Sequence, residues 1–232
     1  ALEVIMTTLH AGGKFSDKAY ATAGGLHGVG ISVVNALSER VEVEVARDKK
    51  VYMQAFERGL PVGGLQLIGA APNRRGTAVR FKPDFQIFGE KLRFRPTRLF
   101  QMARSKAYLY RGVELRWKCD ASLLSEDSKI PAEATLSYPN GLSDQLDEVF
   151  KGKQTITENT FTGLVDAGEE GKVEWAIAWT RAGFGDNDGF SRSYCNTIPT
   201  PDGGTHEAGF RAAITKGLRN YGELTGEKKA ST

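Results

Sequence analysis

Hydrophobic and polar positions alternate most regularly in residues 41–45, where Val41, Val43 and Val45 are separated by two glutamates. Strict alternation over a short run is typical of a β-strand that buries one face. Further strands are predicted at residues 51–56, 65–68, 77–81, 113–117, 134–138, 173–180 and 191–198. Residues 59–64, which contain three glycines, are predicted to form a turn between two of these strands.

Apolar residues recur at helical spacing in three longer segments. Residues 96–110 begin with Pro96, a residue that suits the first turn of a helix. Residues 142–150 predict a short helix, and an amphipathic helix is predicted from Thr205 to about Tyr221. Strands that cluster between short helices favour an α+β fold.

The composition is that of an ordinary globular protein. Of the 232 residues, 40% are hydrophobic and 25% are charged, which argues against disorder. No window approaches the roughly 18 apolar residues that span a bilayer, and the first ten residues lack the features of a secretory signal, so we expect neither a membrane protein nor a secreted one. Cys119 and Cys195 are too few and too far apart for a disulfide framework or a zinc cluster, and they indicate a cytoplasmic protein.

Charge is unevenly distributed, although the net charge is only +3. Residues 85–118 contain nine basic and two acidic side chains, whereas residues 119–232 contain 11 basic and 18 acidic ones. The nine basic side chains are Lys91, Arg93, Arg95, Arg98, Arg104, Lys106, Arg111, Arg116 and Lys118. One interpretation is a DNA-facing surface that releases phosphate counterions; the other is a solvated helix face balanced by the acidic half of the chain. The second is favoured, because charge runs usually belong to solvated faces.

A glycine-rich loop precedes a predicted helix near the start of the chain. Residues 24–30 contain four glycines and lead into an apolar run at residues 31–37. Such a loop suits phosphate, because glycine lets the backbone approach closely and a helix N-terminus attracts anions. A P-loop is excluded, since Ile31 and Ser32 stand where Lys and Ser or Thr are needed, and a dinucleotide fingerprint is excluded, since no strand precedes the loop.

A longer pattern identifies this loop. Residues 9–15 (Leu-His-Ala-Gly-Gly-Lys-Phe), Tyr20 and residues 24–38 together resemble the ATP lid of the ATPase subunits of bacterial type II topoisomerases, which belong to the GHKL superfamily with Hsp90, MutL and histidine kinases. Residues 76–81 and 202–211 match the same family in the same order, so the resemblance covers nearly the whole chain. Residues 194–206 are more similar to the topoisomerase IV branch than to the gyrase branch.

The resemblance implies that the lid wraps the triphosphate of ATP. The candidate nucleotide-binding residues are Lys14, Tyr20, Gly24, Gly25, Leu26, His27, Gly28, Val29, Gly30, Ile31 and Thr77. Lys14 would place a positive charge near the phosphates, His27 would donate to a phosphate oxygen, and Thr77 would help to recognise the adenine amino group. Each also has an ordinary structural alternative: a solvated lysine, a turn residue and a strand threonine.

The catalytic part of such a site is expected outside the sequence. Ala1 is not an initiator methionine, and residues 1–9 resemble a helix without an N-cap, so we expect a fragment. The family's general base, a glutamate, and its magnesium-binding asparagine are expected upstream of Ala1, and a Gln-Thr-Lys loop that reaches the γ-phosphate is expected beyond Thr232. Residues 153–155 hold these letters in another order, which we interpret as coincidence. No catalytic or metal-binding residue is predicted within the chain, and we expect the parent protein, but not this segment alone, to hydrolyse ATP.

The resemblance also implies the domains, the reaction and the partners. Residues 1–151 would be the C-terminal part of a GHKL (Bergerat-type) α/β sandwich, and residues 152–232 the N-terminal part of a ribosomal S5-like transducer domain. The implied function is ATP-driven DNA strand passage, with decatenation and relaxation, using ATP and Mg2+ in the bacterial cytoplasm at the nucleoid. The implied partners are DNA, a second copy of the same ATPase protein once ATP has bound, and the DNA-cleaving topoisomerase IV protein ParC in an A2B2 heterotetramer.

Three alternatives remain at this point. The chain could belong to the ATPase component of DNA gyrase, which introduces negative supercoils. A GHKL-like nucleotide switch would bind ATP and dimerise without hydrolysing it, if the upstream catalytic residues are absent. A basic DNA-binding protein with no nucleotide role would show salt-dependent DNA affinity and no response to ATP analogues; the long lid match makes it the least favoured.

Overall fold

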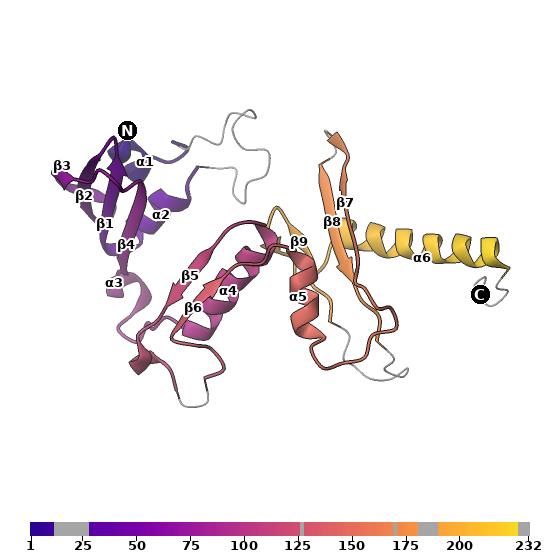
Figure 1. Ribbon diagram of the computed structural model, residues 1–232. Helices are drawn as coiled ribbons and strands as arrows, with labels where there is room; N and C mark the ends of the chain where they lie inside the picture. Colours follow the sequence, from indigo (N-terminus) through magenta and orange to yellow (C-terminus); the bar gives the residue numbers. More distant parts are fainter. Residues whose placement is uncertain (12–27, 126–127, 169–170, 181–189, 227–232) are drawn as a thin grey trace. The chain divides into compact units, whose positions relative to one another are not determined.

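The computed structural model describes residues 1–11, 28–125, 128–168, 171–180 and 190–226 (Figure 1). They form two compact units, residues 1–94 and residues 95–232. Both units contain helices and antiparallel strands, which confirms the predicted α+β class. The domain boundary expected at residue 151 falls inside the second unit and stays a prediction.

The first unit is a four-stranded antiparallel sheet with short helices beside it (Figure 1). Its strands follow the order β3-β2-β1-β4. The strands are β1 (Ser38–Arg47), β2 (Lys50–Glu57), β3 (Leu60–Ala70) and β4 (Gly76–Pro83), and the helices are α1 (Leu2–Thr7), α2 (Gly30–Ala36) and α3 (Phe85–Phe88). The sheet places both neighbours of the alternating segment, β2 and β4, in hydrogen-bonded register with it.

The core of this unit lies on the face of β1 that the valines occupy. Met6, Val41, Val43 and Phe56 form a buried cluster, with Met6 supplied by α1. Burial of each such side chain is worth roughly 1.5–3 kcal/mol, which is sufficient to hold the short α1 against the sheet. The alternation of valine and glutamate in β1 therefore has the predicted physical cause.

The turn predicted at residues 59–64 is wrong. The chain reverses within Arg58 and Gly59 alone, both of which have positive φ, at 48° and 88°. Two consecutive left-handed residues match the natural twist of a hairpin and need no further loop. Strand β3 therefore starts at Leu60, and the glycine at position 63 lies within the strand, where the register with β2 shifts.

The second unit contains three two-stranded antiparallel ribbons and three helices among its described residues. Its helices are α4 (Pro96–Leu109), α5 (Leu142–Val149) and α6 (Thr205–Thr225), with a 3-10 turn at Ala121–Leu123. The ribbons pair β5 (Leu115–Lys118) with β6 (Glu133–Leu136), β7 (Phe161–Asp166) with β8 (Lys172–Ile177), and β9 (Tyr194–Cys195) with β10 (Ile198–Pro199). The strand predicted at residues 191–198 is instead this last hairpin, because Asn196 and Thr197 adopt left-handed φ and reverse the chain.

Helix α4 is held on one side by apolar packing and on the other by polar contacts. Phe100 and Ala107 are buried with Leu136 from β6, and Trp117 packs edge-on against Phe100 at 5.5 Å between ring centroids. Tyr108 contributes its hydroxyl to a hydrogen bond with a carboxylate of α5. Burial raises the pKa of that hydroxyl well above its usual range, so it stays protonated as a donor.

Candidate nucleotide-binding site

The structure describes five of the candidate residues, namely Gly28, Val29, Gly30, Ile31 and Thr77. The other six, Lys14, Tyr20, Gly24, Gly25, Leu26 and His27, lie outside the described residues. The described part of the lid is therefore its two stems: α1, which ends at Thr7, and α2, which begins at Gly30.

The backbone enters α2 through a glycine turn with no side-chain cap. Gly28 adopts φ 60°, and the N-cap position is taken by Val29, whose side chain has no hydrogen-bond acceptor. A Cβ at Gly30 would meet no atom within 4 Å, so the backbone is open on that side. The Ser32 hydroxyl donates back to the Val29 carbonyl at 3.0 Å instead of capping the helix. Uncapped N–H groups at a helix start favour negative charge.

The two stems are joined by a buried hydrogen bond. The Asn35 side-chain amide in α2 donates to the Met6 carbonyl in α1 at 3.0 Å, and Asn35 is completely buried. Sequence reasoning missed this residue, although it lies within the lid-like run at residues 24–38. A polar residue at an otherwise apolar position of a short helix was the available signal. The bond fixes where the lid segment leaves and re-enters the sheet.

Thr77 and the second stem lie on the same face of the sheet. Thr77 is directly opposite Val45 in the β1–β4 register, and opposite residues of antiparallel strands share a face. Val45 and Ile31 both pack against the buried cluster of the first unit. The structure thus brings Ile31 and Thr77 to one face, with the Ile31 side chain in the core packing and Thr77 exposed.

The strand beside Thr77 presents an apolar surface. Val79 and Phe81 follow it at alternate positions of β4 and remain 44% and 46% exposed. Phe94 packs edge-on against Phe81, with ring centroids 6.0 Å apart. One hydroxyl next to an apolar face suits a flat heteroaromatic ring, which needs a polar partner at its edge and apolar contact on its face.

The end of β4 is fixed by a buried carboxylate. Asp84 accepts from Arg58 Nε at 2.6 Å and from the Gln86 backbone N–H at 2.9 Å, which caps α3. The Arg58 guanidinium and then the Gln86 amide hold the pKa of Asp84 below its usual range. This contact ties the β2–β3 hairpin to the strand that carries Thr77.

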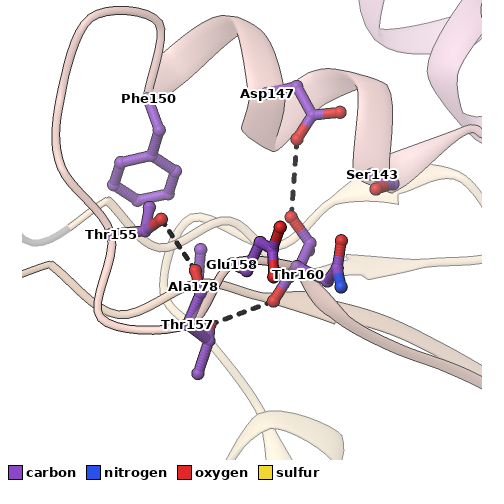
Figure 2. A pocket seen from close by; sticks show the side chains of 9 residues that line it. Ser143, Asp147, Phe150, Thr155, Thr157, Glu158, Thr160 and Ala178 are labelled. Carbon is purple, nitrogen blue, oxygen red and sulfur yellow. Dashed lines mark hydrogen bonds between the residues drawn. The ribbon is translucent and has the colours of Figure 1, made fainter.

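A cavity in the second unit has a different chemistry (Figure 2). It measures about 450 Å³ and is lined by α5, β8 and the loop between α5 and β7. Asp147 and Glu158 make it acidic, and Thr155 uses its hydroxyl to donate to the Thr157 carbonyl at 2.8 Å. Thr155 belongs to the run at residues 153–155, which thus forms part of a loop beside acidic side chains, a poor setting for phosphate.

Two further kinds of site were sought among the described residues. Within them, no group of three or more His, Cys, Asp or Glu side chains could hold a metal ion. None of the helices described has the length and apolar character that crossing a bilayer requires.

The sequence and the fold are both similar to known topoisomerase ATPase proteins. The DNA gyrase B family model matches residues 141–232. The DNA topoisomerase 4 B protein of Caulobacter vibrioides is 60% identical over 232 residues, all of this chain and 33% of the relative. The corresponding protein of Salmonella typhimurium is 44% identical over 96% of this chain and 34% of its own length. The chain therefore spans about a third of the length of these curated relatives.

Two solved structures resemble the protein along nearly its whole length. The 43K ATPase domain of Thermus thermophilus gyrase B, solved with an aminocoumarin, has a TM-score of 0.73 and 34% identity over 97% of this chain and 54% of that one. The topoisomerase IV ATP-binding domain of Francisella tularensis, solved with a small-molecule inhibitor, has a TM-score of 0.65 and 29% identity, over 96% and 54% of the two chains. By sequence and by fold, this chain belongs to the ATPase region of the bacterial topoisomerase IV B proteins, a family related to the gyrase B ATPase domain.

Proposed function

We propose that this chain carries the ATP lid of a type II DNA topoisomerase in which ATP binding and hydrolysis drive one DNA duplex through a break in another. Decatenation and relaxation are the expected outcomes. The observation that carries the proposal is the shared face of Ile31 and Thr77, which places the lid's second stem and the adenine-recognition candidate on one side of the same sheet.

The described residues fit a nucleotide in two ways. The uncapped start of α2, with Gly28 in a left-handed conformation, leaves backbone N–H groups available for phosphate oxygens. Thr77, beside exposed apolar side chains of β4, suits the edge of the adenine ring. Gly24 to Gly30 would enclose the phosphates, with Lys14 as a point charge and Tyr20 as a further contact. Bound ATP supplies the phosphoanhydride bond whose cleavage resets the closed state.

The chain's own contribution is binding and enclosure. The family resemblance assigns the general base, the Mg2+ ligand and the γ-phosphate lysine to motifs that this sequence does not contain. Within the resemblance, residues 1–151 are part of a GHKL α/β sandwich and residues 152–232 are part of an S5-like transducer domain. DNA, a second copy of the ATPase protein and the DNA-cleaving protein ParC, in an A2B2 heterotetramer, complete the proposed machine.

The proposal is tested by ATP-analogue affinity and ATP turnover of the full-length protein. Lys14→Ala is expected to weaken analogue binding roughly tenfold or more, because a charge-assisted contact to phosphate is worth about 1.5–3 kcal/mol. Lys50→Ala removes the same charge from an exposed position at the start of β2 and serves as the control. Equal affinities for the two variants would contradict the role of the lid.

The reaction itself separates the alternatives. Together with the DNA-cleaving partner, the proposed enzyme decatenates linked DNA circles and relaxes supercoils when ATP is added. Introduction of negative supercoils would assign the chain to gyrase instead. Analogue-driven dimerisation without any ATP turnover would identify a nucleotide switch.

A further inference from the structure

The nine basic side chains of residues 85–118 fall into two groups in the structure. Five are engaged by partners within their own unit. Arg104 contacts Glu148, Lys106 donates to the Thr197 carbonyl, Arg111 contacts Glu174, Arg116 contacts Glu114, and Lys118 contacts Glu133. Four of these five cations face a carboxylate, so their charge is largely compensated in place. The sequence alone treated all nine as one run.

The remaining four lie together at residues 91–98. Lys91, Arg93, Arg95 and Arg98 are exposed, and none of them forms an ion pair with any residue that the structure describes. Arg93 donates to the backbone carbonyls of residues 90 and 92, which leaves its charge uncompensated. We name these four residues the cationic segment. Glu90 borders it, is exposed, and forms no ion pair within the described part of the chain.

The position of two of these cations does not favour the helix they adjoin. Arg95 is the N-cap of α4 and makes no capping hydrogen bond, and Arg98 lies in the first turn, which contains no acidic residue. The positive end of the helix dipole disfavours cations there and would favour Asp or Glu. Stability of α4 therefore gives no reason for these residue types, whereas an anionic ligand would be attracted by the side chains and the dipole together.

We propose that the cationic segment binds the phosphate backbone of duplex DNA. Eight residues of chain extend over no more than about 29 Å, so the four charges stay within that span whatever the local backbone conformation. Duplex DNA presents one negative charge per about 1.7 Å of its axis, so this length offers several phosphates at once. A single nucleotide would engage only one or two of the charges. The inference rests on the proposed function, which supplies DNA as the partner.

The structure also provides a matched control for the test. Arg116 and Lys118 lie on β5 with 82% and 81% of their side chains exposed, yet each contacts a glutamate. Replacing this pair removes two positive charges, as does replacing Arg95 and Arg98. Net charge falls equally in the two variants, and only the compensation of the lost charges differs.

The experiment measures binding of a short fluorescent DNA duplex to the full-length protein while salt is varied between about 50 and 200 mM. For Arg95→Gln/Arg98→Gln, the slope of log affinity against log salt should fall in magnitude by up to about 1.8, because each lost phosphate contact removes about 0.9. Lys91→Gln/Arg93→Gln should behave similarly. Arg116→Gln/Lys118→Gln should leave the slope close to that of the unaltered protein. Equal slopes for all variants, or equal reductions in the control and the test variants, would overturn the proposal.

ATP hydrolysis without DNA, measured on the same proteins, separates this inference from the proposed function. Retained hydrolysis with unchanged DNA slopes would overturn the cationic segment alone. Reduced slopes in a protein that neither binds nor hydrolyses ATP would overturn the proposed function and leave the DNA contact in place. Loss of binding to anionic vesicles instead of DNA would assign the segment to a membrane surface and overturn the inference.

Discussion

The Asn35 amide donates a hydrogen bond to the Met6 carbonyl at 3.0 Å and links the helix before the lid to the helix after it. Asn35 is completely buried, and its carbonyl oxygen has no partner among the described residues. The first unit thus retains a buried polar residue with half of its hydrogen-bonding capacity unused. The position of the lid stems is the structural feature that this bond secures.

Asn35→Ala should lower the free energy of unfolding by roughly 1–3 kcal/mol, because the Met6 carbonyl would stay buried without its donor. Urea denaturation measures the loss. Asn73→Ala, in an exposed turn of the same unit, provides the control and should change stability by less than about 0.5 kcal/mol. If the stems position the lid, the KM for ATP should also rise in Asn35→Ala and not in Asn73→Ala. Similar losses of stability in the two variants would show that the buried bond contributes nothing.

Gly163→Ala should destabilise the β7–β8 ribbon. Gly163 lies directly opposite Trp175, and a Cβ at that position would come closer to the indole ring than real Cβ contacts allow. Forcing the ring aside should cost roughly 1–3 kcal/mol. Chemical denaturation reports this cost.

Two further variants check that steric explanation. In a Trp175→Ala background, Gly163→Ala should cost much less, because the ring that blocks the Cβ is gone. Gly209→Ala is the matched glycine control: it lies within α6 with no atom within 4 Å, and alanine there should stabilise the helix by about 0.5–1 kcal/mol. The same cost for Gly163→Ala in both backgrounds would rule out the clash.

The Arg58–Asp84 pair should make the first unit sensitive to acid. The pKa of Asp84 is lowered in the folded protein, chiefly by Arg58, so the unfolded chain takes up the proton at higher pH than the folded one. The stabilisation is therefore present above the ordinary Asp pKa and is lost as pH falls through the lower, folded-state pKa. Asp84→Asn should flatten this part of the stability profile.

Urea midpoints measured between about pH 7 and pH 3 test that expectation, since this range extends below the ordinary Asp pKa. Glu90→Gln is the control, because Glu90 is an exposed carboxylate in the same unit with no ion pair in the part of the chain that the structure describes. The difference between the two profiles should appear only on the acidic side. Identical profiles for the two variants would count against a role of Asp84 in acid stability.

Local patterns in the sequence predicted the elements whose cause is local. The valine–glutamate alternation of β1 reports a strand with one buried face, and Pro96 correctly marks the start of α4. The errors arose where backbone conformation decides the outcome. Left-handed Arg58 with Gly59, and Asn196 with Thr197, reverse the chain in two residues each, although only one of these four is a glycine. Strand β7 was missed, because its pairing with β8 and the ring of Trp175 over Gly163 come from the partner strand.

The sequence by itself determined the family, since the lid-like run is a contiguous pattern that survives without coordinates. It also located the glycine entry into α2. Only the tertiary structure decided which charges are compensated: Arg104 and Arg111 meet the carboxylates of Glu148 and Glu174, far along the chain. It likewise decided the bond between Asn35 and Met6, which are 29 residues apart. Contacts of this kind depend on how distant segments pack, and a one-dimensional pattern of residue types does not encode the distance between two atoms.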